Sequence, residues 1–539
     1  MKKNSFIQGT ITAYIAILIT KVLGALYVIP FYKIIGETGG TLYSYAYNVY
    51  ALFLEISTSG IPTAVAIIIA EYNTLKMFNE REYTFKVANR AISIISFVTF
   101  LIMFIFAGSI GTFFIGNLKG GNDVASVALV IRVISFCLLI VPFLSTTRGY
   151  LQGNKYTAVS SFSQLIEQFT RIVIVLVGSY LAINVLDLSI PVGVGFALSG
   201  TVIGALAAFL YLRYKIHQNK QLFQRGVTNY KESSVKQKEV LKKIATCAIP
   251  VVIISITQNL YNTIDLKLIL VGLNMIGYPA ENCELIASII ITWGSKICMI
   301  INALATGMCM SIIPFIVNSY VKKDNKELNK KINQAINTIL YIAVPLTLFI
   351  IIFSKPVYYI FYGTSIYGYN ILKVLVFVNL FFTLSLVLSM SLQGMKKYKV
   401  VYLSTFMGLV INTLLDVPMI LLLNKFNFYP YVGSMVATII GQVVTILIVL
   451  LSLRKEFKFS YKPIFRTISK MIVPLLIIGI PSIFIQSIFD LSSYIKTFIL
   501  LGFVGLVYVG VYAALTFRNS LLTDILGNRI INKILKKSN

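Results

Sequence analysis

Fourteen apolar segments run along this chain of 539 residues, and lysine and arginine gather in every second connection between them. A helix needs about 20 predominantly apolar residues to cross a bilayer, and within lipid it must satisfy its own backbone hydrogen bonds. Because 57% of the residues are hydrophobic and only 12% are charged, we predict an all-α polytopic membrane protein with about 14 transmembrane helices. The predicted spans are 6–32, 43–74, 88–111, 124–147, 158–183, 190–212, 244–272, 285–320, 332–354, 369–393, 400–424, 431–453, 467–488 and 495–517.

The basic residues between the spans predict the orientation. Both terminal segments and each even-numbered connection carry two or more of them, whereas the odd-numbered connections hold only Lys33, Lys119, Lys355 and Lys425. The positive-inside rule then places both termini in the cytoplasm of a cell-membrane protein. We interpret the net charge of +28 as loops held at the anionic lipids of the cytoplasmic leaflet, and not as a nucleic-acid surface.

Two pairs of similar motifs predict an internal repeat. Leu-Gln-Gly occurs at 151–153 and at 392–394, and Ala-Asn-Arg-Ala-Ile at 88–92 resembles Ile-Asn-Gln-Ala-Ile at 332–336. Since six spans are an even number, both lobes enter the membrane in the same direction, which favours a V-shaped, pseudo-twofold pair. The predicted domains are an N-lobe (1–215), a basic cytoplasmic loop (216–243), a C-lobe (244–455), and two further spans with a basic tail (456–539).

Ionisable residues inside spans are costly and therefore mark candidate sites. Lys21 and Lys296 fall in the middle of spans 1 and 8, and two ammonium groups facing one cavity suit a phosphate or diphosphate. Glu55, in the middle of span 2, is the candidate that neutralises one of them when the cavity is empty. Burial of these lysines in pairs with Glu55 or with neighbours is the structural alternative, and it stays open.

A second set of charges is a candidate for structural or coupling roles. Glu167 and Arg171 are four residues apart, so they share a helix face and are interpreted as an ion pair. No Gly-rich phosphate loop and no His/Cys cluster occurs in the sequence, so we expect no metal and no cofactor, with transport coupled to the membrane potential or to a monovalent cation. This set comprises Arg132, Glu167, Arg171, Asp265, Lys267 and Asp416.

Several motifs resemble one family. Thr20–Gly24, Tyr43–Tyr47, Gly60-Ile61-Pro62 and Gly149–Gly153 are similar to the polysaccharide-export branch of the MOP flippase superfamily, which includes the stage V sporulation protein B group and the MurJ lipid II flippases. The resemblance implies fourteen helices in two lobes, with spans 13 and 14 forming a groove for a lipid tail. It also implies that Lys21 and Lys296 match basic cavity residues. Two other basic positions of that family are not matched, because Tyr27 and Leu54 fall at or near them.

These observations predict a flippase that is not an enzyme and that moves a lipid-linked saccharide diphosphate, lipid II or a related polysaccharide precursor, from the inner to the outer leaflet by alternating access. The expected partners are this lipid-linked saccharide and anionic lipids, with cell-envelope synthesis proteins as further candidates. A cation-coupled drug or metabolite exporter of the same superfamily is the alternative. A membrane-embedded glycosyltransferase or polymerase, and a scaffold in an envelope complex, fit the residues less well.

Overall fold

Helices make up the architecture in the computed structural model, which describes residues 19–20, 22–116, 118, 120–224, 228 and 235–526. Within these residues every regular element is a helix, as the apolar pattern predicts. Twelve helical segments are long and apolar enough to cross a membrane, and Ile312–Val321 is a shorter apolar helix in the described part of the chain. The all-α membrane class is therefore confirmed, while the count of 14 spans stays a prediction.

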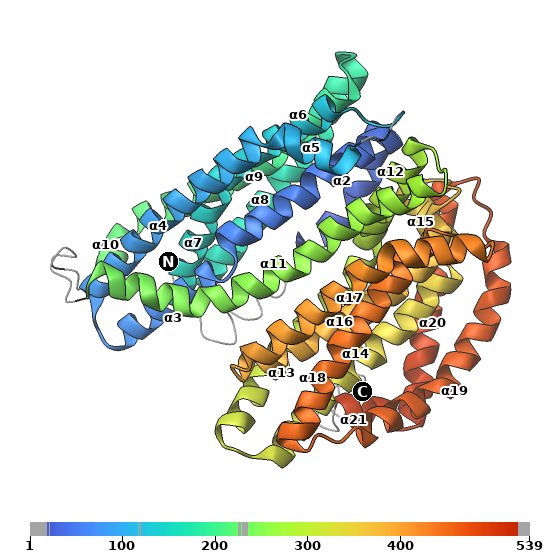
Figure 1. Ribbon diagram of the computed structural model, residues 1–539. Coiled ribbons are helices and arrows are strands. Elements are labelled where there is room, and N and C mark those ends of the chain that lie inside the picture. Colours follow the sequence, from blue (N-terminus) through green and yellow to red (C-terminus); the bar gives the residue numbers. More distant parts are fainter. Residues whose placement is uncertain are drawn as a thin grey trace. The chain divides into compact units, whose positions relative to one another are not determined.

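The chain divides by its own contacts into a first unit, Met1–Thr292, and a second unit, Trp293–Asn539. In the first unit α8 and α9 run side by side, and α3 packs on α7 (Figure 1). The helices of this unit are α2 (Val28–Thr58), α3 (Ile61–Thr74), α4 (Phe78–Ile105), α5 (Ala107–Ile115), α6 (Val124–Ser135), η1 (Phe136–Leu139), α7 (Val141–Gly153), α8 (Thr157–Tyr180), η2 (Leu181–Val185), α9 (Ile190–Gln218), α10 (Lys220–Gln224), α11 (Gln237–Met275) and α12 (Ala280–Ser288), and η4 (Ile289–Trp293) crosses the boundary.

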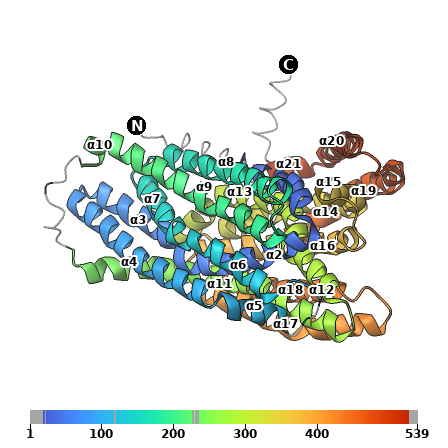
Figure 2. The same ribbon diagram turned by 90° about the horizontal axis from the view of Figure 1, so that it is seen from above.

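In the second unit α17 packs along α18, and α13 packs on α16. The last two long helices, α19 and α20, lie beside α14 and α15 respectively (Figure 2). The helices are α13 (Gly294–Val321), α14 (Asn325–Ile352), α15 (Ser354–Tyr362), α16 (Gly368–Gly394), α17 (Tyr398–Lys425), α18 (Val432–Phe457), α19 (Lys462–Ile485), η5 (Gln486–Ile488), α20 (Tyr494–Arg518) and α21 (Leu521–Leu526).

Glycines set the breaks in the first apolar segment, which runs for 53 residues from Val22 to Thr74. Gly36 has φ 66° and ψ −171° inside α2, so the helix is interrupted there. The hydroxyls of Tyr27 and Tyr43 lie 3.4 Å apart, although 16 residues of straight helix would separate them by about 24 Å. The chain therefore folds back near Gly36, which separates the predicted spans 1 and 2. A second break at Gly60, with φ 73°, precedes α3.

The basic central loop is shorter than the prediction. Span 6 ends at residue 212 and span 7 begins at 244 in the sequence-based assignment, whereas α9 continues to Gln218 and α11 begins at Gln237. Hydropathy marks only the apolar part of a helix. It therefore misses the polar turns at the end of α9 and at the start of α11. Both α11 and α12 pack on α2 within the first unit.

The turns after the two Leu-Gln-Gly motifs have the same geometry, which the helix ends at Lys76 and Lys323 share, so the repeat stays a prediction. Lys155 and Lys396 both adopt positive φ, 68° and 58°. In each turn the lysine amide donates to the glutamine carbonyl at 2.9 Å, and the next amide donates to the leucine carbonyl at 2.9 Å. This is the same left-handed helix cap in both units.

Candidate functional site

The predicted substrate-binding residues lie in different parts of the chain. Lys21 lies outside the described residues. Glu55 is half-buried on α2, one turn before the break at Gly60, and its backbone carbonyl accepts from Ser59 at 3.0 Å. Lys296 is half-buried in the first turns of α13 in the second unit. The structure therefore describes the surroundings of Lys296 and Glu55 separately.

An aromatic side chain accompanies Lys296. The Nζ atom of Lys296 lies 4.7 Å from the ring centroid of Trp293. Trp293 is completely buried. Trp293 also packs edge-on against Tyr362, whose hydroxyl donates to the Trp293 carbonyl at 2.7 Å. A ring face attracts a cation through its quadrupole without cancelling the positive charge. This arrangement therefore holds the ammonium group of Lys296 against the Trp293 ring at the start of α13.

Glu167 and Arg171 of α8 form a cluster of three charged residues with Arg148 of α7 in the first unit. Arg171 Nη2 lies 3.5 Å from Glu167 Oε1, at the i, i+4 spacing recognised in the sequence. Arg148, on α7, binds the same carboxylate more closely, with Nη2 2.8 Å from Glu167 Oε2. Its Nε also donates to Ser163 at 2.8 Å. All three charged side chains are less than one-fifth exposed, so one carboxylate is shared by two guanidinium groups.

Sequence reasoning assigned Arg148 to a cytoplasmic connection and missed this contact. The neighbouring glycines were the available signal that this segment is packed inside the protein. Gly149 and Gly153 let α7 approach α3 closely. A Cβ on Gly149 would lie 2.3 Å from the Pro62 carbonyl oxygen, and one on Gly153 would lie 2.6 Å from that of Ala66. The close approach holds α7, the helix that carries Arg148, against α3.

Tyrosines cover the same region of the first unit. Tyr43, Tyr47 and Tyr50 recur at helical spacing along α2, and Tyr43 stacks on Tyr47 with ring centroids 5.6 Å apart. The charge of Arg171 acts on each of these three phenols. Tyr43 and Tyr50 are only 3% exposed. Tyr43 and Tyr50 are thus packed in the interior, whereas Tyr47 and the three charged side chains are partly exposed.

The other predicted charges lie apart from this cluster. Lys267 on α11 donates from Nζ to the carbonyl of Phe114 at 3.2 Å, and Asp265 is buried on the same helix. Arg132 is exposed on α6 and lies over the Phe104 ring at 5.9 Å. Asp416 is completely buried on α17 of the second unit. Lys267 and Arg132 therefore have contacts other than Glu167, and Asp416 belongs to the other unit.

A buried carboxylate that sequence reasoning did not single out lies at the start of span 8. Glu284 on α12 is 2% exposed. Its oxygens accept from the amide of Asn122 at 3.2 Å and from Asn122 Nδ2 at 2.6 Å. Asn122 Nδ2 also donates to Thr41 Oγ1 at 2.6 Å. Glu284 thereby joins α12 to α2 and to the loop before α6, a contact that no local pattern predicts.

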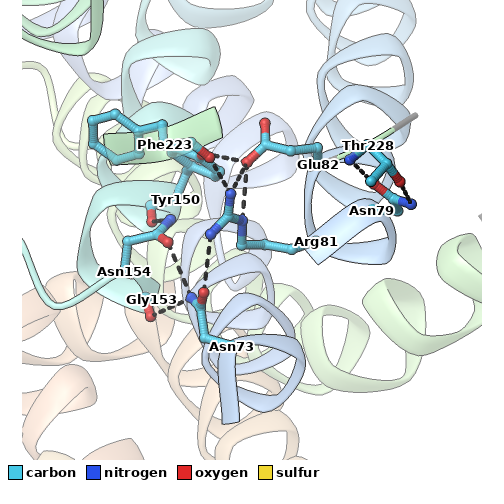
Figure 3. A network of polar contacts seen from close by, with 9 residues as sticks. All are labelled: Asn73, Asn79, Arg81, Glu82, Tyr150, Gly153, Asn154, Phe223 and Thr228. Atoms are coloured by element: carbon cyan, nitrogen blue, oxygen red, sulfur yellow. Dashed lines mark hydrogen bonds and ion pairs between the residues drawn. The ribbon is translucent and has the colours of Figure 1, made fainter. Parts of the chain in front are cut away.

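A polar network ties together several helix ends of the first unit (Figure 3). Arg81 is 4% exposed at the start of α4 and donates to Asn73 at 3.1 Å, to the Phe223 carbonyl and to Glu82 at 3.0 Å. Tyr150 donates to the same Glu82 oxygen at 2.5 Å. The network connects α3, α4, α7 and α10, so it anchors the segment that leads into the basic central loop.

No metal-binding constellation is present in the described residues, where no group of three or more His, Cys, Asp or Glu side chains comes together. The described charges are ion pairs, hydrogen-bonded carboxylates and cations near aromatic rings. Such an arrangement can attract an anion or stabilise helix packing, and it offers no evident acid–base pair.

Comparison with known proteins decides the family. A model of the polysaccharide biosynthesis protein family matches residues 6–276. The chain belongs to this family. A model of the MatE family matches residues 286–417. The resemblance inferred from the motifs is thus confirmed.

Relatives and solved structures agree with this assignment. The chain is 29% identical to the lipid II flippase MurJ of Bacillus subtilis over 98% of both chains. It is 24% identical to stage V sporulation protein B of the same organism over 39% of each chain. In fold it is similar to a solved lipid II flippase MurJ in an inward closed conformation, with a TM-score of 0.66, 16% identity, and coverage of 93% of this chain and 98% of that one.

A second solved structure of similar fold is that of a multidrug transporter. The chain is similar to an inward-facing multidrug resistance MATE family transporter of the MOP superfamily, with a TM-score of 0.65 and 15% identity over 83% of this chain and 98% of that one. These likenesses establish the MOP transporter fold and a multi-pass membrane protein. The flippase or transporter class follows from them, together with the similarity to MurJ along the whole chain.

Proposed function

We propose that this protein is a flippase that moves a lipid-linked saccharide diphosphate, lipid II or a closely related polysaccharide precursor, from the inner to the outer leaflet by alternating access. The observation that carries the proposal is the 29% identity to a lipid II flippase over 98% of both chains. The position of Lys296 over the Trp293 ring supports it, because a cation inside a span suits an anionic head group.

In this mechanism Lys21 and Lys296 contact the diphosphate, and Glu55 offsets one ammonium charge when no substrate is bound. The saccharide crosses through a hydrated path while the lipid chain stays in the bilayer. An inside-negative potential favours outward movement of anions by roughly 2.3 kcal/mol per charge per 100 mV. Two negative charges therefore gain roughly 4 to 5 kcal/mol per 100 mV, provided that the lysines remain in place while the substrate moves.

The cation-coupled exporter is a weaker candidate on these contacts. It needs a carboxylate that exchanges H⁺ or Na⁺, and Glu167 is already shared by Arg148 and Arg171. Asp265 is buried in the first unit and Asp416 in the second.

The test measures lipid-linked precursor on the outer face of cells depleted of this protein, then rescued at equal expression. Wild type should restore exposure, whereas Lys21→Ala and Lys296→Ala should not. Lys373→Ala is the matched control, since Lys373 is another lysine within a predicted span and is exposed on α16. If depletion leaves the amount of precursor on the outer face unchanged in cells that lack a redundant flippase, this precursor is not the substrate. Full rescue by both alanine variants would assign the two lysines to structure.

A further inference from the structure

A cavity of about 320 Å3 lies in the second unit, where α15 meets the loop before α16. Lys355 and Tyr359 of α15 line one side, Thr364, Ser365 and Tyr369 line another, and Leu491 from the connection between α19 and α20 completes it. Both connections are odd-numbered and therefore belong to the predicted outer face. The cavity volume is at the lower end of the range of small-ligand pockets.

The donors around this cavity suit an anion. Lys355 is exposed, and among the described residues no carboxylate forms an ion pair with it. Ser365 Oγ accepts from the Gly368 amide at 3.0 Å, so its hydroxyl hydrogen remains able to donate. The Thr364 hydroxyl and the Tyr369 phenol add donors of the same kind. A lysine with several hydroxyls is a common setting for phosphate.

The nearest acidic residue on the neighbouring connection already has partners. Asp490 accepts from Ser492, at 3.1 Å from its amide and 2.6 Å from its hydroxyl. The Ser492 hydroxyl lowers the pKa of this exposed carboxyl. Lys496 also acts on Asp490 electrostatically. Asp490 is therefore engaged by Ser492 and Lys496, and among the described residues no carboxylate forms an ion pair with Lys355.

The surroundings of the cavity are apolar and aromatic. Tyr359 stacks on Tyr494 of α20 with ring centroids 4.5 Å apart. Ile366 at the rim is 78% exposed, and Ile495 and Phe498 on α20 are 73% and 59% exposed. Tyrosines beside exposed apolar residues are typical of the membrane–water interface. A ligand here would have its polar group at Lys355 and an apolar chain along α20.

We propose that this cavity binds the phosphate of an anionic lipid in the outer leaflet. Lys355 contacts the phosphate, the hydroxyls of Thr364 and Ser365 donate to it, and the hydrocarbon chain lies along the exposed side of α20. The two sources of this chemistry are a phospholipid and a polyprenyl diphosphate carrier. The site goes beyond the proposed function, because it requires only a lipid phosphate on this face and no transport step.

The experiment measures lipid binding to the purified full chain in phosphatidylcholine nanodiscs by native mass spectrometry. The probes are phosphatidylglycerol, a polyprenyl diphosphate and inorganic phosphate, each titrated separately. Lys355→Gln should weaken binding of at least one lipid probe about tenfold, because one charge-assisted hydrogen bond is lost. Lys355→Arg should retain it. Lys425→Gln is the matched control, since Lys425 is an exposed lysine at the end of α17 on the same predicted face.

The binding results distinguish a phospholipid from a polyprenyl diphosphate carrier as the ligand. Loss of phosphatidylglycerol binding alone assigns a phospholipid, and loss of polyprenyl diphosphate binding alone assigns the carrier. Equal lipid binding by Lys355→Gln, Lys425→Gln and wild type would overturn the site, as would inorganic phosphate binding as tightly as the lipids. Failure of the proposed function is seen independently, as unchanged precursor exposure in depleted cells.

Discussion

Two charged clusters, one in each unit, are held inside their helices in different ways. In the first unit Glu167 binds both Arg148 and Arg171, and Glu284 accepts from Asn122. In the second unit the ammonium of Lys296 lies over the Trp293 ring. A carboxylate between guanidinium groups makes the packing depend on every member of the cluster, whereas an aromatic ring holds a cation and leaves its charge in place. The comparison therefore separates charges that hold helices together from a charge suited to an anionic substrate.

The largest expected effect is on stability in the first unit. Glu167→Gln leaves Arg148 and Arg171 close together without a counter-charge, so the free energy of unfolding should fall by about 3 to 5 kcal/mol. Denaturant-induced unfolding of the purified protein measures this. Glu71→Gln is the control, because the Glu71–Lys243 pair at 3.1 Å is almost half exposed and should cost about 1 kcal/mol or less. Equal effects of the two variants would contradict a structural role for Glu167.

The second prediction concerns the repeated Leu-Gln-Gly motif. Gly153→Ala places a Cβ 2.6 Å from the Ala66 carbonyl oxygen, whereas the nearest atom to a Cβ on Gly394 is Val317 Cγ2 at 3.0 Å. Backbone yields less readily than a side chain, so Gly153→Ala should destabilise by about 1 to 3 kcal/mol and Gly394→Ala by less. Thermal unfolding of both variants checks the order. The reverse order would mean that α7 and α3 can separate more easily than α16 and α13.

The third prediction sharpens the functional side of the comparison. Lys296→Met should reduce precursor exposure about tenfold, which corresponds to about 1.4 kcal/mol in the transport barrier. Its free energy of unfolding should fall by less than that of Glu167→Gln, because methionine keeps an apolar contact with the Trp293 ring and leaves no two guanidinium groups together. Lys296→Arg should keep part of the activity, since charge is retained while geometry changes. A large loss of stability in Lys296→Met would place this lysine with the structural charges.

The smallest expected effect is the same in both units. Lys155 and Lys396 adopt left-handed backbone conformations, which favour glycine. Lys155→Gly and Lys396→Gly should each raise the free energy of unfolding by up to about 1 kcal/mol. Lys→Val at either position should lower it, since β-branched residues tolerate positive φ poorly. Opposite signs for the two glycine variants would indicate that the two caps are not equivalent.

Prediction from sequence succeeded where hydrophobicity alone decides. The helical membrane class and the family motifs were readable, because a backbone in lipid must form helices or closed barrels. Helix ends were less accurate, as α9 and α11 extend into the basic connection. Of the predicted substrate-binding residues, Lys21 lies outside the described residues, so its role stays a prediction with those of Lys296 and Glu55.

The sequence by itself determined that this protein consists of long apolar helices joined by basic connections, and it marked the few ionisable residues that lie within spans. Only the tertiary structure decided their partners. Arg148 and Glu167 are 19 residues apart in sequence, and they meet because α7 and α8 pack against each other. Likewise, Lys355 and Leu491 line one cavity although they belong to different connections. Hydrophobicity is a property of each segment, whereas side-chain partners depend on which helices pack together.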